Sequence, residues 1–315
     1  MNQLINQEPA ITSHLLMIKP KHFGFNEETA TNNAFQINDK VLNLSQISAL
    51  ALEEFEHFVD ILKEARLDIT VIEDKETPVI PDSVFPNNWF STHADGTVVT
   101  YPMFSKQRRL ERREDIFDYL AKRFIISNRV HFEEAEEKNQ FLEGTGSLIL
   151  DRSNKVVYAC RSIRTNDALL QQWAKKMNYR LFVFNSKDKN NLDIYHTNVM
   201  MALGEDFVIW GGDSLPEYSE RELVENQFIM SGKTIIPISN EQIGSFAGNM
   251  LAVKNINGEK LIIMSNTAYN SLTNGQIAQI ESFSKIIKAN IPTIEKYGGG
   301  SVRCMLAEIY LPESE

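Results

Sequence analysis

Residues 140–160, QFLEGTGSLILDRSNKVVYAC, contain an apolar stretch, a turn of small polar residues, and a second apolar stretch. This is the pattern of two β-strands joined by a hairpin. It recurs along the chain, and recurrence at a fixed period is the signature of a repeat architecture. The other copies are VFPNNWFSTHADGTVVTYPM (84–103), YHTNVMMALGEDFVIWGG (195–212), SFAGNMLAVKNINGEKLIIMS (245–265) and GGGSVRCMLAEIYLP (298–312), the last paired with SHLLMIKP (13–20).

One polar residue recurs at the start of the first strand of each copy. These residues are Asn88, Glu143, His196, Asn249 and Cys304, separated by 55, 53, 53 and 55 positions. Helix-like stretches with apolar residues at i, i+3 and i+4 follow at 111–124, 165–178, 219–231 and 275–289, and further strands at 180–185 and 234–239. The spacing predicts five β-β-α-β units in an α/β fold, a five-bladed α/β-propeller closed by both chain ends, with residues 1–315 as one domain.

Composition limits the classes of partner. The chain carries 32 Lys and Arg against 42 Asp and Glu, a formal net charge of −10, which argues against nucleic acid as a partner. The basic run KQRRLERR at 106–113 is expected to be a solvated helix face. The N-terminus has no signal-peptide pattern, and no stretch is apolar for the length of a membrane span. We therefore expect a cytoplasmic protein that does not bind membranes.

The repeated residues have a chemistry that suits a pocket, because a propeller brings equivalent positions of its blades together around one axis. Cys304 follows a run of glycines that lets the backbone approach a ligand, so we predict that it is the nucleophile rather than a small buried side chain. The only other cysteine, Cys160, lacks this setting and is expected in the core. His196 would serve as acid and base, or as a structural histidine. Glu143 needs a cationic or hydrogen-bonding partner if it is buried.

Four segments in order resemble the guanidine-modifying (pentein) superfamily, which includes arginine deiminases, dimethylarginine dimethylaminohydrolases, agmatine deiminases and amidinotransferases. They are PDSVFPNNWFST, FLEGTGSL, YHTN and GGGSVRCM, and the last is the most specific. The resemblance covers nearly the whole chain and implies the propeller fold. Within the superfamily the chain is most similar to the citrulline-utilisation hydrolase type, through FPNNWFSTH and through YPM followed by RRLERR.

The resemblance also implies residue roles. Cys304 would attack the central carbon of the substrate head group, His196 would transfer protons, and Glu143 would bind the head-group nitrogens. Arg164 would receive the substrate carboxylate, helped by Arg108 or Arg109, since a guanidinium fork suits a carboxylate. Backbone N–H groups of the loop through Gly298, Gly299 and Gly300 would stabilise the tetrahedral intermediate. No metal or organic cofactor is expected.

Two positions depart from the family pattern and bear on the substrate. Asn88 stands where the family usually has an Asp, and Asn198 stands where arginine deiminases have another. A buried guanidinium would lack charge pairing there, whereas a neutral ureido group would suit carboxamides. We therefore expect an amino acid as the small-molecule partner, and citrulline as the substrate that yields ornithine, ammonia and carbon dioxide. An arginine deiminase or dimethylarginine hydrolase, an amidinotransferase, a non-catalytic binding propeller, and assembly into a homo-oligomer remain alternatives.

Overall fold

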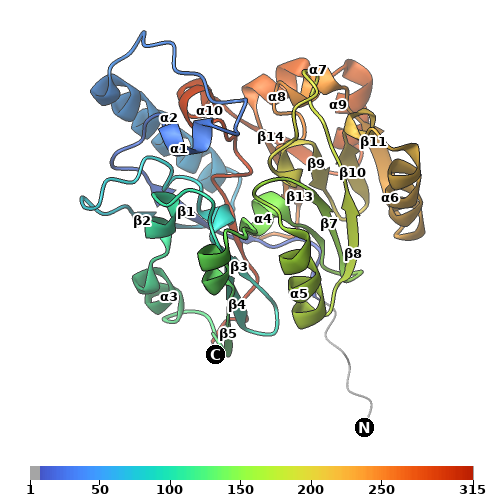
Figure 1. Ribbon diagram of the computed structural model, residues 1–315, viewed down its shortest axis with the longest axis horizontal. Coiled ribbons are helices and arrows are strands. Elements are labelled where there is room, and N and C mark those ends of the chain that lie inside the picture. Colours follow the sequence, from blue (N-terminus) through green and yellow to red (C-terminus); the bar gives the residue numbers. More distant parts are fainter. Residues whose placement is uncertain (1–7, 315) are drawn as a thin grey trace.

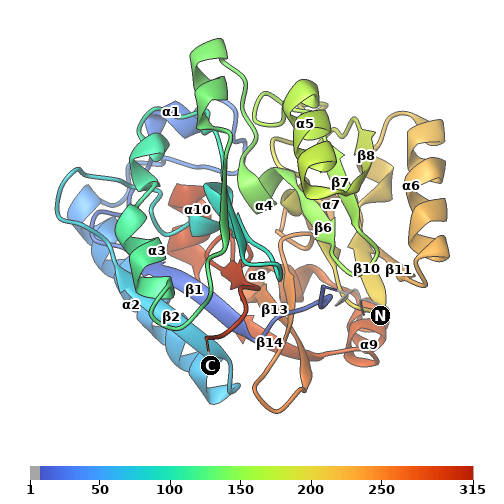
Figure 2. The same cartoon turned by 90° about the horizontal axis from the view of Figure 1, so that it is seen from below.

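Each sequence repeat forms one three-stranded sheet, and five sheets surround a common centre (Figures 1 and 2). The fold is known from a computed structural model, which describes residues 8–314. The first three sheets are β3 (Phe90–Thr92), β4 (Thr97–Thr100) and β5 (Asn128–His131); β6 (Ile149–Asp151), β7 (Val156–Cys160) and β8 (Arg180–Phe184); and β9 (Met201–Leu203), β10 (Phe207–Trp210) and β11 (Thr234–Pro237). The other two are β12 (Leu251–Lys254), β13 (Lys260–Ser265) and β14 (Lys285–Ala289), and β15 (Ala307–Ile309), β1 (His14–Lys19) and β2 (Asp68–Glu73).

All five sheets share one topology. The first two strands pair antiparallel and the second and third pair parallel, as in β6–β7 and β7–β8. In the fifth sheet β1 lies between β15 and β2, with His14 opposite both Ile309 and Asp68. The predicted closure of the ring by both chain ends is therefore confirmed, as is the five-bladed α/β-propeller.

Helices occupy the outside of the ring, where Figure 2 shows α2, α3, α5, α6 and α9. Their bounds are Leu44–Glu64 for α2, Glu114–Leu120 for α3, Asp167–Met177 for α5, Tyr218–Met230 for α6 and Asn274–Glu281 for α9. Shorter helices are α1 (Glu27–Ala30), α4 (Gly144–Ser147), α7 (Asn240–Ile243), α8 (Asn266–Ser271) and α10 (Pro292–Gly298). No helix among residues 8–314 is both long and apolar enough to cross a membrane.

Local sequence explains where these helices start and stop. Asn43 and Gln46 form a capping box at the start of α2, and each side chain accepts a hydrogen bond from a free backbone N–H group. Asn178 in the left-handed conformation ends α5.

Two predictions about local structure were wrong. The expected helix 275–289 ends at Glu281, and residues 285–289 form β14 parallel to β13. The β-branched Ile286 and Ile287 fit a half-buried strand better than a helix. The basic run at 106–113 is not a solvated helix face either, because it contains the short 3₁₀-helix η2 (Arg108–Glu111), in which Arg108 is 3% exposed.

Candidate active site

The five repeated polar residues occupy equivalent turns, each just before the first strand of its sheet. Asn88 ends the 3₁₀-helix η1 (Pro86–Asn88), Glu143 precedes α4, His196 precedes the 3₁₀-helix η4 (Thr197–Val199), and Asn249 and Cys304 lie in turns before β12 and β15. They were expected at the start of these strands, whereas each lies just before its strand. Asn88, His196 and Cys304 line one pocket, and Glu143 and Asn249 bond to His196 and Cys304.

Cys304 lies on the wall of a small pocket, hereafter the Cys304 pocket. The pocket has a volume of about 20 Å³ and is lined by Thr29, Asn33, Asp82, Phe85, Asn88, Arg108, Arg164, Tyr195, His196, Gly298, Gly299, Gly300 and Cys304. The thiol is free and 4% exposed. Its Sγ atom accepts hydrogen bonds from the side-chain amides of Asn249, at 3.3 Å, and Asn198, at 3.6 Å. Two side-chain amides therefore donate to the sulfur.

His196 and Glu143 form a buried pair. The Nε2 atom of His196 lies 2.8 Å from Oε2 of Glu143, and the backbone N–H of Phe104 donates to Oε1 at 2.9 Å. Burial lowers the pKa of His196 to about 4, although Glu143 opposes this shift. Burial alone would raise the pKa of Glu143, but the charge of Arg164 and the bond from His196 hold it well below its usual value. A neutral imidazole therefore donates Nε2–H to a carboxylate, which leaves Nδ1 as a base.

Glu143 stands behind His196 rather than on the wall of the pocket. Its side chain is completely buried, and both its oxygens already have partners. The structure thus brings Glu143 to the imidazole, whereas the sequence analysis expected it at the substrate head group. A carboxylate in this place orients the ring and stabilises its protonated form.

Glycine is required at 146 by close packing. A Cβ atom at Gly146 would lie 2.5 Å from Nδ2 of Asn88 and 2.7 Å from Nδ1 of His196. These distances are shorter than any van der Waals contact, so a side chain would displace both groups. The Asn88 amide and the free imidazole nitrogen therefore both lie close to the Cα atom of Gly146.

Arg108 fixes the amide of Asn88. Its Nη1 donates to Oδ1 of Asn88 at 2.8 Å, while Nε and Nη2 donate to the two carboxylate oxygens of Glu111 at 2.6 and 2.9 Å. Because an arginine can only donate, Oδ1 of Asn88 must be the acceptor, and the amide group Nδ2 faces the other way. Among residues 8–314, Nδ2 is buried and has no hydrogen-bond partner. The pocket therefore holds an unused hydrogen-bond donor at 88.

Arg164 also lines the pocket, but Thr29 and Asn32 already accept hydrogen bonds from its guanidinium. Nε donates to Oδ1 of Asn32 at 2.7 Å, Nη2 donates to the carbonyl of Thr29 at 3.0 Å, and Nη1 lies 3.5 Å from Glu143. The ring of Tyr195 lies 4.8 Å from the guanidinium carbon. A substrate carboxylate can reach Arg164 only by displacing Asn32.

Other predicted positions differ from expectation. Arg109 is not in the pocket, because its Nε donates to the carbonyl of Met103 at 3.0 Å and lies 3.4 Å from Glu136. Gly299 and Gly300 do line the pocket, and Gly299 has a φ of +63°. The N–H of Gly299, however, already donates to the carbonyl of Glu295 at 2.9 Å, so it is not free to stabilise an intermediate.

Asp82 is a wall residue to which the sequence analysis gave no role. Its Oδ2 accepts from Asn26 at 2.8 Å and lies 3.9 Å from Nε of Arg108. Its Oδ1 is buried and has no hydrogen-bond partner in the part of the chain that the structure describes. Burial raises the pKa of Asp82, although Arg108 and Asn26 oppose the shift. The only available signal was an acidic residue beside an apolar run in PDSVF. Asn249 had a clearer signal, its repeat position, but received no role.

Comparison with known proteins gives one family and one fold. The family model for N,N-dimethylarginine dimethylhydrolase, eukaryotic, matches residues 19–311. No curated protein sequence matches the chain.

Solved structures share the fold at low sequence identity. The N-terminal domain of ArgZ, described as an arginine dihydrolase from cyanobacteria, aligns with a TM-score of 0.72 and 18% identity over 95% of this chain and 99% of that domain. Unliganded AgrE aligns with a TM-score of 0.73 and 16% identity over 96% of this chain and 40% of its own. A dimethylarginine dimethylaminohydrolase adduct with S-methyl-L-thiocitrulline aligns with a TM-score of 0.64 and 18% identity over 95% and 99%.

Proposed function

The chain belongs to the N,N-dimethylarginine dimethylhydrolase family of guanidino carbon–nitrogen hydrolases, and we propose from this premise that it hydrolyses an amino acid with a ureido or guanidino head group through Cys304. Citrulline is the substrate that the arrangement of donors and acceptors in the Cys304 pocket supports best. The products would be ornithine, ammonia and carbon dioxide.

The proposed catalytic set is Cys304, His196 and Glu143. The neutral imidazole takes the thiol proton, and the amides of Asn198 and Asn249 stabilise the resulting thiolate. Glu143, at 2.8 Å, stabilises the imidazolium that forms. This division of tasks follows from the low pKa of both buried groups, which leaves the imidazole as a base and the carboxylate as an anion.

The reaction then proceeds in two halves. The sulfur adds to the ureido carbon, and the imidazolium of His196 gives its proton to the terminal nitrogen, which leaves as ammonia. This leaves a thiocarbamate, in which Cys304 is joined to the carbonyl carbon of the substrate. His196 next removes a proton from water, hydroxide adds to the carbonyl, and the thiolate leaves and recovers the proton. The carbamic acid released loses carbon dioxide and yields ornithine.

The observation that carries citrulline over arginine is the fixed orientation of Asn88. Arg108 holds Oδ1 as an acceptor, so the buried and unpaired Nδ2 requires an acceptor on the ligand. A ureido group has a carbonyl oxygen to offer, whereas a guanidinium has only donors. A guanidinium there would place its N–H groups against the N–H groups of Asn88 and leave Nδ2 without an acceptor. A binding site discriminates strongly against a ligand that leaves a buried polar group unpaired.

Two further groups support an amino-acid end on the substrate. Arg164 has a guanidinium held by Asn32, an uncharged side chain that a carboxylate would replace with a charge-assisted pair. Asp82 has an unpaired buried oxygen, which suits an ammonium group. An α-amino acid supplies both charges.

Asp82 also favours a second candidate, hydrolysis of arginine or a methylated arginine. An unpaired carboxylate oxygen in the pocket could receive a guanidinium instead of the α-ammonium. The ArgZ domain with the same fold is described as an arginine dihydrolase, and the family model is that of a dimethylarginine hydrolase.

The test is to incubate purified protein with citrulline, arginine and dimethylarginine, each with and without glycine, and to quantify ornithine, citrulline and ammonia. Ornithine and ammonia from citrulline would support the proposal, and citrulline from arginine would support the second candidate. Product formed only with added amine would identify an amidinotransferase.

Cys304→Ser should abolish turnover and Cys160→Ser should retain it, because Cys160 is completely buried away from the pocket. Full activity of Cys304→Ser would refute the mechanism.

A further inference from the structure

The Cys304 pocket is too small for an amino acid. Its volume is about 20 Å³, whereas one water molecule alone needs roughly 10–15 Å³ of such space. A part of the wall must therefore move before a substrate can reach the thiol of Cys304. Thr29 and Asn33 belong to one such part, residues 26–37, hereafter the wall segment.

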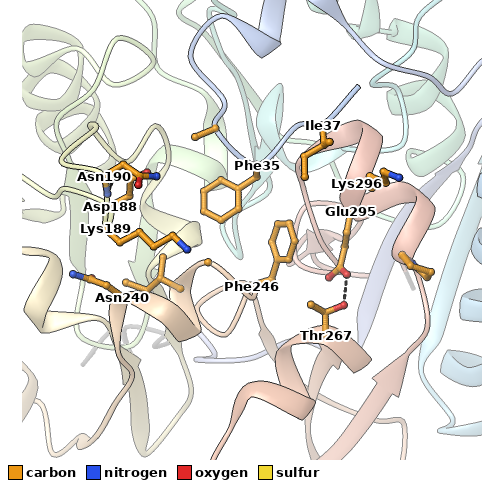
Figure 3. A pocket seen from close by; sticks show the side chains of 14 residues that line it. Phe35, Ile37, Asp188, Lys189, Asn190, Asn240, Phe246, Thr267, Glu295 and Lys296 are labelled. Atoms are coloured by element: carbon orange, nitrogen blue, oxygen red, sulfur yellow. Dashed lines mark hydrogen bonds between the residues drawn. The ribbon is translucent and has the colours of Figure 1, made fainter. Parts of the chain in front are cut away.

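The wall segment has room to move. Residues 26–37 take no part in any of the five sheets, and their only regular element is the single turn of α1. Two open spaces adjoin the segment, a cavity of about 360 Å³ beside Ala34, Phe35 and Ile37, and a groove of about 420 Å³ beside residues 30–34. Figure 3 shows the side chains of Phe35 and Ile37 at the first of these spaces. Segments without sheet pairing and with free space beside them open at low cost.

Polar side chains hold the wall segment to two charged groups of the pocket. Oδ1 of Asn32 accepts from Nε of Arg164 at 2.7 Å and also from Nη2. The carbonyl of Thr29 accepts from the same Nη2 at 3.0 Å, while Nδ2 of Asn26 donates to Oδ2 of Asp82 at 2.8 Å. The segment thus offers Arg164 an acceptor and Asp82 a donor, as the carboxylate and the ammonium of an α-amino acid would.

Asn32 is a weaker partner for Arg164 than a carboxylate is. Its carboxamide is neutral, whereas a carboxylate makes charge-assisted hydrogen bonds that are about twice as strong. Arg164 is 2% exposed, so its guanidinium needs a protein or ligand acceptor in place of water. Glu143 lies 3.5 Å from Nη1 but is already bonded to His196. The contact with Asn32 is therefore strong enough to close an empty pocket and weak enough to yield to an anion.

We propose that Asn32 is a built-in competitor of the substrate at Arg164. It holds the wall segment closed over the empty pocket, and the α-carboxylate of the substrate replaces it on Arg164 when the segment moves away. The part of this inference that concerns the substrate rests on the proposed function. The strength of the contact between Asn32 and Arg164 sets the fraction of open molecules, and the apparent KM varies inversely with that fraction.

Alkylation of Cys304 by iodoacetamide, a small neutral reagent, measures opening without any substrate. Mass spectrometry of the peptide that contains Cys304 gives the rate, and rates are compared on the alkaline plateau of the pH profile, where the fraction of thiolate no longer differs. Asn32→Ala removes the contact and should raise the rate by roughly threefold or more. Asn32→Asp gives Arg164 a charged partner and should lower it by roughly threefold or more. Cys160, which is completely buried, should stay unmodified.

Opposite signs distinguish a latch from a general structural role, because mere loss of packing would raise the rate in both variants. Asn226→Ala and Asn226→Asp are the matched controls, since Asn226 is exposed on the outer helix α6. Both should react at the rate of the wild type. Equal rates in the wild type and the two Asn32 variants, or a change of the same sign in both, would overturn the inference.

Kinetics with citrulline test the competition itself. Asn32→Ala should lower KM and Asn32→Asp should raise it, by factors close to those seen in alkylation and with a smaller change in kcat. An unchanged KM in both variants, with the expected alkylation rates, would refute competition at Arg164. If the protein turned over none of the proposed substrates, the alkylation rates would still decide whether Asn32 holds the pocket closed, so failure of the proposed function is distinguishable from failure of this inference.

Discussion

Replacing Asn88 by aspartate would change one buried atom of the Cys304 pocket from a donor to an acceptor. The contact of Arg108 with Oδ1, at 2.8 Å, survives in the variant, and the added charge lies beside that guanidinium, so the fold should be retained. Citrulline would lose its hydrogen bond from Nδ2 and face a carboxylate instead. Leaving such a group unsatisfied costs about 1–3 kcal/mol, which corresponds to a loss of roughly 5- to 150-fold in kcat/KM.

Arginine should respond in the opposite direction. Its guanidinium would gain a charged acceptor at 88, so kcat/KM for arginine should rise while that for citrulline falls. The assay is kcat/KM for both substrates from initial rates of ammonia release. Asn274→Asp is the control for the added charge, because Asn274 is exposed at the start of α9 and does not line the pocket. Thermal unfolding of both variants should show that they are folded. An unchanged ratio of the two substrates in Asn88→Asp, or an equal change in Asn274→Asp, would refute the reasoning.

Three further predictions concern catalysis and stability. As the pH is lowered, kcat/KM should decline near pH 4, because burial lowers the pKa of His196 to about 4. Glu143→Gln should move this decline to still lower pH, because Glu143 raises the pKa of His196, and should reduce kcat by on the order of 10². Gly146→Ala should reduce kcat at least tenfold in a folded protein, since its Cβ would lie 2.7 Å from Nδ1 of His196. Glu8→Gln should lower the free energy of unfolding by about 3 kcal/mol in urea titration, because buried Arg152, at 2.7 Å, loses its partner.

Matched variants keep these predictions specific. Gly275→Ala, in α9, should leave kcat unchanged, because a Cβ atom there would meet only Oγ1 of Thr273, at an ordinary contact distance of 3.9 Å. Glu27→Gln, on the exposed face of α1, should leave unfolding unchanged. An acid limb that remains near pH 6.5, or equal losses in the control variants, would contradict the assignments.

The sequence predicted the fold well because a hairpin is a local pattern that repeats. Apolar alternation, a turn and a polar residue at a fixed step are all visible without knowing any tertiary contact. The same step predicted that Cys304 and His196 would line one pocket, since equivalent blade positions converge. It could not reveal that Glu143 would bond to the imidazole and not line the pocket, because that depends on the backbone conformation of one turn.

The charged wall residues were harder to predict. Arg108 belongs to a basic run that resembles a solvated surface, and only the folded chain shows that Glu111 neutralises it from three residues away. Asp82 is brought to the pocket through Asn26, which lies 56 residues earlier in the sequence. Periodicity reports which face of an element is apolar, but it does not report which long-range partner a buried charge will find.

The repeat gives five equivalent turns, yet the chemistry of each depends on its neighbours from other sheets. Asn88 and Asn249 carry the same amide, but Arg108 orients the first as a donor to the pocket, whereas the second donates to the sulfur of Cys304. Under the proposed function, substrate choice would rest on Arg108 as much as on Asn88, because without the arginine the amide could rotate and offer its oxygen to a guanidinium. A departure from the family pattern at one position is thus meaningful only together with the residue that fixes its orientation.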